Sequence, residues 1–221
     1  MELYTVSELS KCYENWNIRL RKKNETYVIK NLNLTINENE FICIIGKSGV
    51  GKTTLLKMLG GIEKPSGGGV FYRNMELYKC SEVKMEEYRR KEIGFIFQDY
   101  KLLDEITVRE NILIPQILDG AKREVAENKM DNLVKLLGIK EKKFFYPYEL
   151  SGGEKQRVAI CRALINNPNV ILADEPTGNL DSYNTELILK ILIQIKKRKK
   201  TIILVTHDKE ICKYADRVIY L

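Results

Sequence analysis

Residues Gly46-Lys47-Ser48-Gly49-Val50-Gly51-Lys52-Thr53 form a glycine-rich loop between an apolar run, Phe41–Ile45, and a helical pattern that begins at Thr54. The pattern G-x-x-x-x-G-K-T directs backbone N–H groups and a helix N-terminus toward one point, where they bind phosphate anions. In such a loop Lys52 reaches the β- and γ-phosphates, and the Thr53 hydroxyl ligates Mg²⁺. The flanking strand and helix favour this interpretation over a glycine-rich turn that carries a lysine by chance. We therefore predict a nucleotide site that includes Gly46, Lys47, Ser48, Gly49, Val50, Gly51, Lys52, Thr53 and Thr54.

The composition describes a chain that can fold without disulfides or structural metals. A domain of 221 residues buries roughly 70% of the surface of its unfolded chain. The cysteines are scattered, contain no C-x-x-C pair and accompany a single histidine, which argues for free thiols in a reducing cytosol and against zinc. No signal-peptide pattern begins the chain, and no apolar run approaches the roughly 18 residues that span a bilayer. We expect a protein that does not insert into a membrane. Its cysteines are Cys12, Cys43, Cys80, Cys161 and Cys212.

Two basic runs, Arg19–Lys23 and Lys196–Lys200, supply much of the net charge of +7. Solvated surface is the favoured interpretation, and the second run also suits the C-terminus of a helix. An anionic membrane surface or a nucleic acid are the alternative partners for such charge. We expect no nucleic-acid partner.

Apolar runs alternate with helical patterns in the last third of the chain. Val170–Ala173 and Thr201–Val205 are typical of buried strands, and the apolar residues from Ile188 to Ile195 recur at helical spacing between them. Continuous apolar strands separated by helices indicate a parallel sheet covered on both faces, which is an α/β fold. Earlier in the chain, Asn15–Lys30 suggests a hairpin or loop, and Lys64–Gly69 suggests a turn.

Two carboxylates, Asp174 and Glu175, end the apolar strand that begins at Val170. Ligands of open α/β sheets bind at the carboxyl ends of the strands, so both side chains should lie near the phosphate loop. Asp174 would complete the Mg²⁺ shell, and Glu175 would orient and deprotonate a water that attacks the γ-phosphate. The alternative is a strand end with solvated acids, which the upstream phosphate loop makes less favourable.

Leu150-Ser151-Gly152-Gly153-Glu154 predicts a second anion-binding helix start. Ser151 suits an N-cap, and Glu154 three residues later completes a capping box. The two glycines leave backbone N–H groups accessible to an anion at the positive end of the helix dipole. A well-capped helix without a ligand is the alternative.

Taken together and in this order, the motifs resemble the ATP-binding subunits of ABC transporters over essentially the whole chain. The resemblance rests on Gly46–Thr53, Leu150–Glu154, Asp174–Ser182 and the triplet Thr206-His207-Asp208. It implies an α/β P-loop NTPase fold with a RecA-like core and parallel sheet, an N-terminal antiparallel β subdomain, and a helical insert that carries the signature motif at Ser151.

The same resemblance implies one ABC-type ATP-binding domain over residues 1–221. Residues of about 1–98 and 167–221 would form the β subdomain and the catalytic core. Residues of about 99–166 would form the helical subdomain.

The resemblance also implies residue roles and the cofactors ATP and Mg²⁺. Gln98 would sense Mg²⁺ and the γ-phosphate, and Asp181 would touch a partner subunit. His207 would bond the γ-phosphate, which suits its place after the Thr201–Val205 strand. The implied catalytic residues are Lys52, Gln98, Glu175 and His207, the metal-binding residues are Thr53, Gln98 and Asp174, and the further nucleotide contacts are Ser151, Gly152, Gly153, Glu154 and Asp181.

An aromatic side chain should stack on the adenine base in such a subunit. Tyr13 is the residue that the resemblance indicates. Tyr27 and Trp16 are rivals, because the basic segment between Asn15 and Lys30 is longer than is usual.

A homodimer follows from the resemblance, because Ser151–Gly153 would cap ATP that a second copy holds. Two copies would then enclose two ATP molecules in an isologous interface. The segment after Gln98, through about Asp104, would contact an integral-membrane permease. The protein would lie in the cytoplasm, on the inner face of the cell membrane.

Three sets of motifs place the chain near one branch of the family. Asp174–Ser182 resembles macrolide-export, lipoprotein-release and cell-division subunits, whereas Phe95–Leu103 and Tyr146–Gly153 are closer to bacitracin-type antimicrobial-peptide resistance ATPases. Lipoprotein release or cell division are the alternatives to peptide export or resistance. More distant alternatives are a soluble ABC ATPase that acts on nucleic acid or ribosomes, and a regulatory nucleotide binder without hydrolysis.

Overall fold

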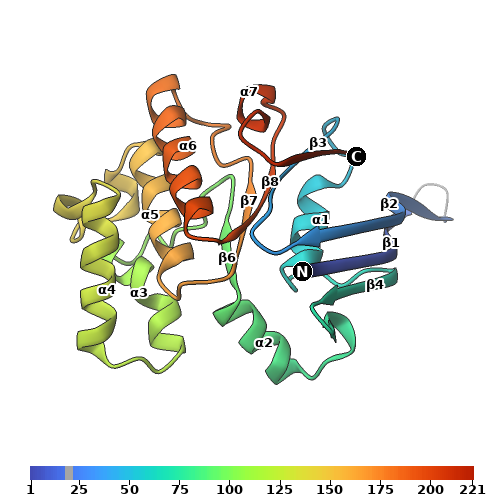
Figure 1. Cartoon of the computed structure of the whole chain (residues 1–221), viewed down its shortest axis with the longest axis horizontal. Helices are drawn as coiled ribbons and strands as arrows, with labels where there is room; N and C mark the ends of the chain where they lie inside the picture. Colours follow the sequence, from blue (N-terminus) through green and yellow to red (C-terminus); the bar gives the residue numbers. More distant parts are fainter. Residues whose placement is uncertain (18–21) are drawn as a thin grey trace.

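A parallel sheet forms the centre of the molecule (Figure 1). The structure is a computed structural model that describes residues 1–17 and 22–221. Within that part of the chain, five strands pair in the order β6-β7-β8-β3-β9. Every residue of β3, β7 and β8 is buried, as expected for a sheet covered on both faces. The strands are β3 (Phe41–Ile45), β6 (Ile93–Ile96), β7 (Val170–Asp174), β8 (Thr201–Val205) and β9 (Arg217–Tyr220).

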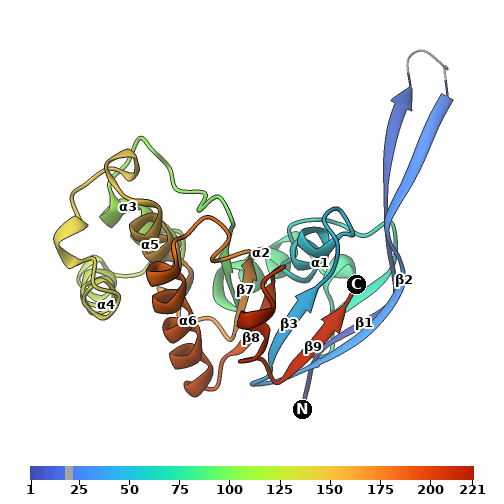
Figure 2. The ribbon, with the colours of Figure 1, turned by 90° about the horizontal axis from the view of Figure 1, so that it is seen from above.

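A second, antiparallel sheet lies beside the first and has the order β2-β1-β4-β5 in the described residues. Figure 2 shows β1 and β2 projecting beyond the rest of the molecule as a long hairpin. The pairing of Asn17 with Lys22 closes this hairpin, which confirms the prediction for Asn15–Lys30. The strands are β1 (Glu2–Asn17), β2 (Lys22–Asn37), β4 (Gly67–Tyr72) and β5 (Met75–Glu76).

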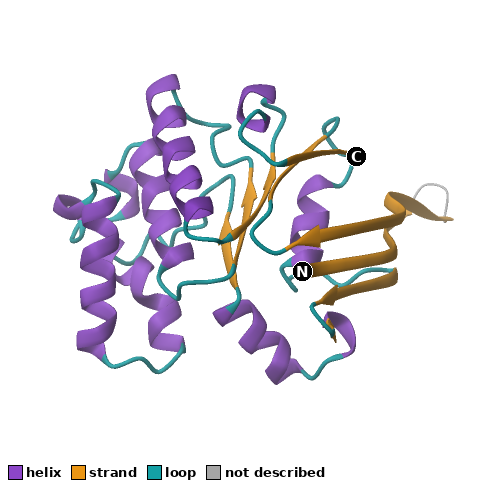
Figure 3. Ribbon diagram, viewed as in Figure 1, coloured by secondary structure: helices purple, strands orange, loops and turns teal. Residues whose placement is uncertain are grey.

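Helices cover both faces of the parallel sheet (Figure 3). α1 (Lys52–Leu59) lies between the two sheets, and α2 (Glu82–Lys91) precedes β6. α3 (Val108–Leu118), α4 (Arg123–Leu136), α5 (Gly152–Leu164) and α6 (Ser182–Lys197) lie on the other side, and α7 (Lys209–Cys212) follows β8. The short 3₁₀ turns are Leu77–Lys79, Lys140–Lys142 and Pro147–Glu149. No helix in the described ranges is both long and apolar enough to cross a bilayer.

Strand β3 shows how one segment serves two cores. Phe41, Cys43 and Ile45 pack with residues of α3 to α6, whereas Ile42 and Ile44 pack with α1 and the antiparallel sheet. Successive side chains of a strand point to opposite faces, so β3 needs apolar residues at every position. Each fully buried side chain of this size contributes about 1.5–3 kcal/mol. This burial anchors the strand from which the phosphate loop departs.

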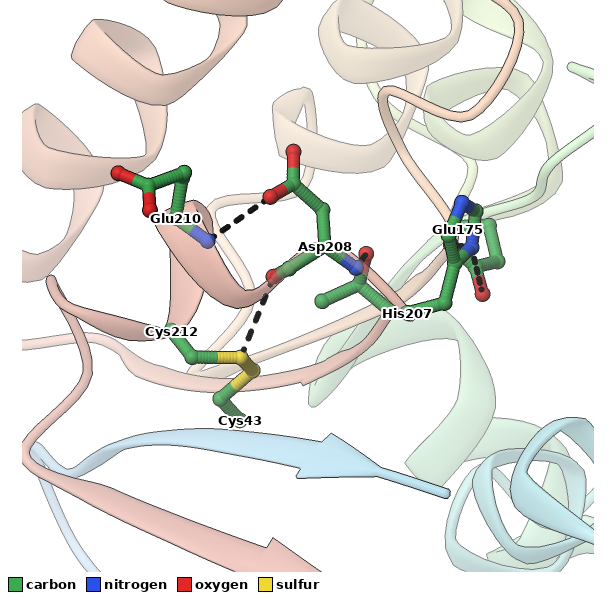
Figure 4. Close-up of a disulfide and its surroundings, with 7 residues drawn as sticks. Cys43, Glu175, His207, Asp208, Glu210 and Cys212 are labelled. Carbon is green, nitrogen blue, oxygen red and sulfur yellow. Dashed lines mark hydrogen bonds and ion pairs between the residues drawn. A yellow bond between two sulfur atoms is a disulfide. The ribbon is translucent and has the colours of Figure 1, made fainter. Parts of the chain in front are cut away.

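Two of the cysteines form a disulfide, so the expectation of free thiols is wrong for this pair. Cys43 and Cys212 are bonded, with Cα atoms 5.5 Å apart (Figure 4). They are separated by 169 residues and meet because α7 packs against β3 in the same apolar cluster. The other three cysteines, Cys12, Cys80 and Cys161, are free.

The predicted turn at Lys64–Gly69 is wrong in its second half, since β4 begins at Gly67. The reason is a close approach of two backbones. Gly68 has a φ of +73°, and a Cβ there would lie 2.4 Å from the carbonyl oxygens of Ser7 and Glu8. Only glycine allows β4 to pair with β1 at this register shift.

Candidate functional site

The phosphate loop surrounds a cavity of about 380 Å³ at the carboxyl edge of the parallel sheet. Gly51 caps α1 with a φ of 100°, and a Cβ there would lie 2.6 Å from the carbonyl oxygen of Val28, so only glycine fits. Five segments that are distant in the sequence meet at this cavity, and all but the segment of Val28 contain residues that we predicted for the site. The lining residues are Val28, Gly46, Ser48, Gly49, Gly51, Lys52, Thr53, Thr54, Gln98, Glu175, Val205 and His207.

Lys52 holds its charge inside the loop. Lys52 is 8% exposed, and its Nζ donates to the carbonyl oxygens of Gly46 at 2.9 Å and Lys47 at 3.0 Å. An ammonium group has three donors, so one remains for a ligand oxygen. Lys47 and Val50 shape the loop rather than line the cavity, through a backbone hydrogen bond of 3.3 Å. The loop therefore combines a buried cation with free N–H groups at a helix start, which suits a phosphate chain.

Thr53 and Asp174 form an oxygen pair behind the loop. The Thr53 hydroxyl donates to Asp174 Oδ1 at 2.9 Å, and Asp174 is 6% exposed at the end of β7. Burial raises the pKa of Asp174, and the neighbouring charge of Glu175 adds to this, although the bond from Thr53 opposes it. A bound hard cation would offset the free-energy cost of burying the charged Asp174 carboxylate. A hydroxyl, one carboxylate and substrate phosphates are a usual set of ligands for Mg²⁺, so these residues fit that ion.

Glu175 and His207 face each other across the cavity mouth (Figure 4). The His207 Nδ1 lies 3.0 Å from Glu175 Oε1 in a hydrogen bond, and it also lies 3.0 Å from the buried Oε2. Glu175 has a φ of 44°, a left-handed conformation that costs a non-glycine residue about 1–3 kcal/mol. Its amide, which donates to Val205 at 2.9 Å, helps to hold this conformation. Glu175 thus brings a carboxylate to the cavity, and a carboxylate is a group that can take a proton from a water.

Gln98 enters the same cavity from the loop after β6. Tyr100 and Lys101, which follow it, have φ values of 60° and 49°. The Arg162 guanidinium of α5 donates to the carbonyl oxygen of Tyr100 at 2.7 Å and to that of Lys101. These bonds link the Gln98 loop to α5. Nothing in the sequence pattern indicated Arg162, because it lies 62 residues from Tyr100 in the chain.

Tyr13 lies beside the first turn of α1. Its hydroxyl bonds to Thr54 Oγ1 at 3.4 Å and donates to Glu63, and the Lys11 ammonium lies 5.1 Å from its ring centroid. Tyr27 of β2 lines a second hollow, of about 370 Å³, together with Tyr13. Tyr13 thus has a contact to the phosphate-loop helix through Thr54. The side chain of Trp16, the other rival, lies outside the described residues.

Ser151 and Glu154 form the predicted capping box at the start of α5. Ser151 Oγ accepts from the Glu154 amide at 3.3 Å, and the Glu154 carboxylate accepts from the Ser151 amide at 2.8 Å. Lys142 lies 3.2 Å from the same carboxylate. None of Ser151, Gly152, Gly153 or Glu154 is among the described residues that line the phosphate cavity. The start of α5 is therefore separate from the cavity, and it is exposed at Ser151.

Asp181 caps α6 next to α5. Its Oδ1 accepts from the Asn184 amide at 2.8 Å, and its Oδ2 accepts from the Asn184 side chain at 2.8 Å. These bonds lower the pKa of Asp181, the backbone bond most. The sequence prediction omitted Asn184, although the spacing of three residues from a cap is the signal that could have found it.

The chain is similar to known proteins over most of its length. The model of the ABC transporter family matches residues 29–178. The bacitracin export ATP-binding protein BceA of Halalkalibacterium halodurans is 40% identical over 217 residues, which are 98% of this chain and 85% of that protein. The lipoprotein-releasing system ATP-binding protein LolD of Bacteroides fragilis is 41% identical over 195 residues, 88% of this chain and 90% of LolD.

Among solved structures, a dimeric post-hydrolysis state of the ATP-binding cassette MJ0796 with ADP and Pi is similar over nearly the whole chain. Its TM-score is 0.90 at 35% sequence identity, covering 99% of this chain and 94% of the cassette.

Proposed function

Because this chain belongs to the ABC transporter ATP-binding family, we propose that two copies of it bind and hydrolyse ATP between them and thereby drive a separate membrane permease. The observation that carries the proposal is the convergence of Lys52, Thr53, Gln98, Glu175 and His207 on one cavity. Cation, hydroxyl, amide, carboxylate and imidazole are the groups that phosphoryl transfer to water requires.

In this proposal each residue acts on a stated atom of ATP. Lys52 and the loop amides hold the β- and γ-phosphates, and Tyr13 stacks on the base. Glu175 accepts a proton from the water that attacks the γ-phosphorus as the bond to the leaving oxygen of ADP breaks. His207 bonds the γ-phosphate and orients Glu175 through the hydrogen bond between them.

Mg²⁺ fits the oxygen ligands beside the loop. Thr53, Asp174 and Gln98 would hold it, and the ion would supply positive charge to the phosphate oxygens. The buried Asp174 carboxylate with a raised pKa supports this assignment.

The dimer would complete the site. The start of α5 lies outside the chain's own phosphate cavity and is exposed at Ser151, which supports a role for Ser151–Gly153 and Glu154 on ATP held by a second copy. Asp181 would approach the same partner site. The cassette MJ0796, at 35% identity, is dimeric in its ADP-bound structure, which adds support.

The permease would contact the segment after Gln98, where Leu103 is 50% exposed. We propose peptide export or resistance as the process, because a relative named for bacitracin export covers 98% of the chain. The lipoprotein-releasing relative supports the alternative, a mechanical role in lipoprotein release or cell division. The protein would act at the cytoplasmic face of the membrane, with residues of about 99–166 as its helical subdomain.

The substitution Glu175→Gln tests the proposal. It removes the proton acceptor and keeps the volume, so turnover of ATP should fall about 10²–10⁴-fold, the usual contribution of a general base. ATP binding should persist, and size-exclusion chromatography should show a dimer that requires ATP. Glu149→Gln, in the 3₁₀ turn before α5, is the matched control and should keep near-normal turnover. Normal turnover in Glu175→Gln, or a strict monomer with ATP, would contradict the proposal.

A further inference from the structure

The N-termini of α5 and α6 are joined by one side chain, Asn184. Its Nδ2 donates to Asp181 Oδ2 at 2.8 Å, and its Oδ1 accepts from Arg157 Nη1 at 2.9 Å. The two neighbours settle the orientation of the amide, because a carboxylate only accepts and a guanidinium only donates. Asn184 therefore bridges the cap of α6 to the second turn of α5.

Steric contact reinforces the bridge. A Cβ added at Gly153 would lie 2.1 Å from Asn184 Oδ1 and 2.4 Å from its Cγ. The Asn184 side chain thus rests directly on the backbone of Gly153, which is buried. A larger residue at position 153 would displace the Asn184 side chain from this place.

Arg157 depends on the same amide. Its Nε is buried without a hydrogen-bond partner, and the described residues show no other acceptor for its guanidinium. Loss of the Asn184 oxygen would leave this cation unsatisfied beneath the start of α5. The geometry of Gly153 and that of Asp181 are consequently coupled through one residue.

We propose that Asn184 is a positioning residue that holds Ser151–Gly153 and Asp181 as one unit for the ATP bound by the second copy. The inference rests on the proposed function, in which both segments act across the dimer interface. It predicts a defect in trans: a copy without Asn184 binds its own ATP normally but serves its partner's site badly.

Dimerisation of the hydrolysis-deficient protein provides the first test. In the Glu175→Gln background, Asn184→Ala and Asn184→Asp should each raise the ATP-dependent dimer dissociation constant at least ~10-fold. The affinity of the monomer for ATP, measured by calorimetry below the dimerisation range, should stay the same. Asn184→Asp keeps the side-chain volume and an acceptor for Arg157, so the fold should be preserved. It replaces the hydrogen bond to Asp181 with repulsion between two carboxylates, so a defect in this variant reports mispositioning rather than misfolding.

Thr107→Ala is the matched control. It removes a side-chain hydrogen bond at the start of α3, which in the described part of the chain shares no hydrogen bond with Asn184 or Asp181, and should leave dimerisation unchanged. Unchanged dimerisation of both Asn184 variants would overturn the inference, and so would an equal loss of monomer affinity for ATP. Failure of the Glu175→Gln parent to dimerise would instead refute the proposed function.

A mixed dimer gives the second test. One copy carries Glu175→Gln, so only the site on the other copy, the live copy, hydrolyses ATP. Asn184→Ala is then placed either on the Glu175→Gln copy or on the live copy, and the single-turnover rates of the two mixed dimers are measured. On the Glu175→Gln copy, Asn184→Ala should slow the live site at least ~10-fold, because misplacement by ~1 Å can cost 10²-fold. On the live copy it should change the rate less than ~2-fold. Equal effects in both arrangements would indicate a purely structural role.

Discussion

The phosphate loop and the start of α5 both offer glycines and helix N–H groups, yet their surroundings differ. The loop is enclosed by a buried cation, a hydroxyl and the two consecutive carboxylates, Asp174 and Glu175, at the end of β7. The start of α5 is exposed at Ser151, and its neighbours Glu154 and Asn184 complete hydrogen bonds within the chain. The residues around the phosphate loop can bind and react with a ligand, whereas the start of α5 offers an exposed residue, Ser151, outside the cavity.

This difference explains why a single copy has the chemical groups and lacks an enclosed site. The cavity at the loop opens to solvent at His207, whose side chain is 73% exposed. Phosphoryl transfer is favoured where water is excluded and charges are preorganised. In the proposed dimer, the start of α5 of the second copy would close over the cavity and exclude water from it.

Gly153→Ala should separate the two regions most strongly. The added methyl would overlap Asn184, so turnover should fall about 10²-fold through displacement of the α5 start, while ATP binding to the monomer persists. Steady-state ATPase assays and calorimetry measure the two quantities. Gly120→Ala adds the same methyl group where no atom lies near the Cβ position and serves as the control, although its φ of +68° brings a backbone penalty that Gly153 lacks. Loss of monomer ATP binding in Gly153→Ala would break the distinction between the regions.

Tyr13→Ala should produce a smaller effect, confined to the loop side. Stacking of a base on an aromatic ring contributes about 1–3 kcal/mol, so KM for ATP should rise roughly 10-fold with little change in kcat. Inhibition by inorganic triphosphate, which has no base, should be unaffected. Tyr27→Ala is the parallel variant, and a larger rise in KM there would assign the base to Tyr27 instead.

The smallest expected effect is that of Asp174→Asn on the thermal stability of the nucleotide-free protein. Since the pKa of Asp174 is raised in the folded state, the native protein binds the proton more readily than the unfolded chain. Stability from this group is gained as pH falls through the raised pKa, and at neutral pH the charge is destabilising. Asn removes that penalty, so the nucleotide-free protein should melt about 2–4 °C higher for each kcal/mol recovered.

Differential scanning fluorimetry across pH 4 to 8 checks this sign. The advantage of Asp174→Asn should shrink toward acid pH, where the wild-type carboxyl is protonated. Stabilisation by Mg²⁺ with ATP should be weaker in the variant. A lower melting temperature at neutral pH would show that the carboxylate is not the destabilising group.

Local patterns predicted the loop side of the site well. Gly46–Thr53, Asp174–Glu175 and His207 are each recognisable in a short window, because strand, turn and helix are adjacent in sequence there. Parallel strands then bring these windows together at one sheet edge without further information. The capping box of α5 is confirmed for the same reason.

Pairs that form across elements could not be predicted. Arg162 with Tyr100, Asn184 with Arg157, and Cys43 with Cys212 depend on which helix faces which loop in the folded chain. Their residue types are ordinary for helix surfaces and strand interiors, so no periodicity marks them. Such contacts follow from tertiary packing rather than from propensity.

The two-sided packing of β3 limits how this cassette can be recombined with its relatives. A chimera that exchanges α3 to α5 must supply side chains that fit Phe41, Cys43 and Ile45, although β3 itself lies outside the exchanged piece. Mismatched volumes on that face would also disturb Ile42 and Ile44, because these two residues alternate with them along the same strand and pack in the opposite core. Grafts designed to move permease specificity between cassettes should therefore transplant the facing strand residues together with the helices.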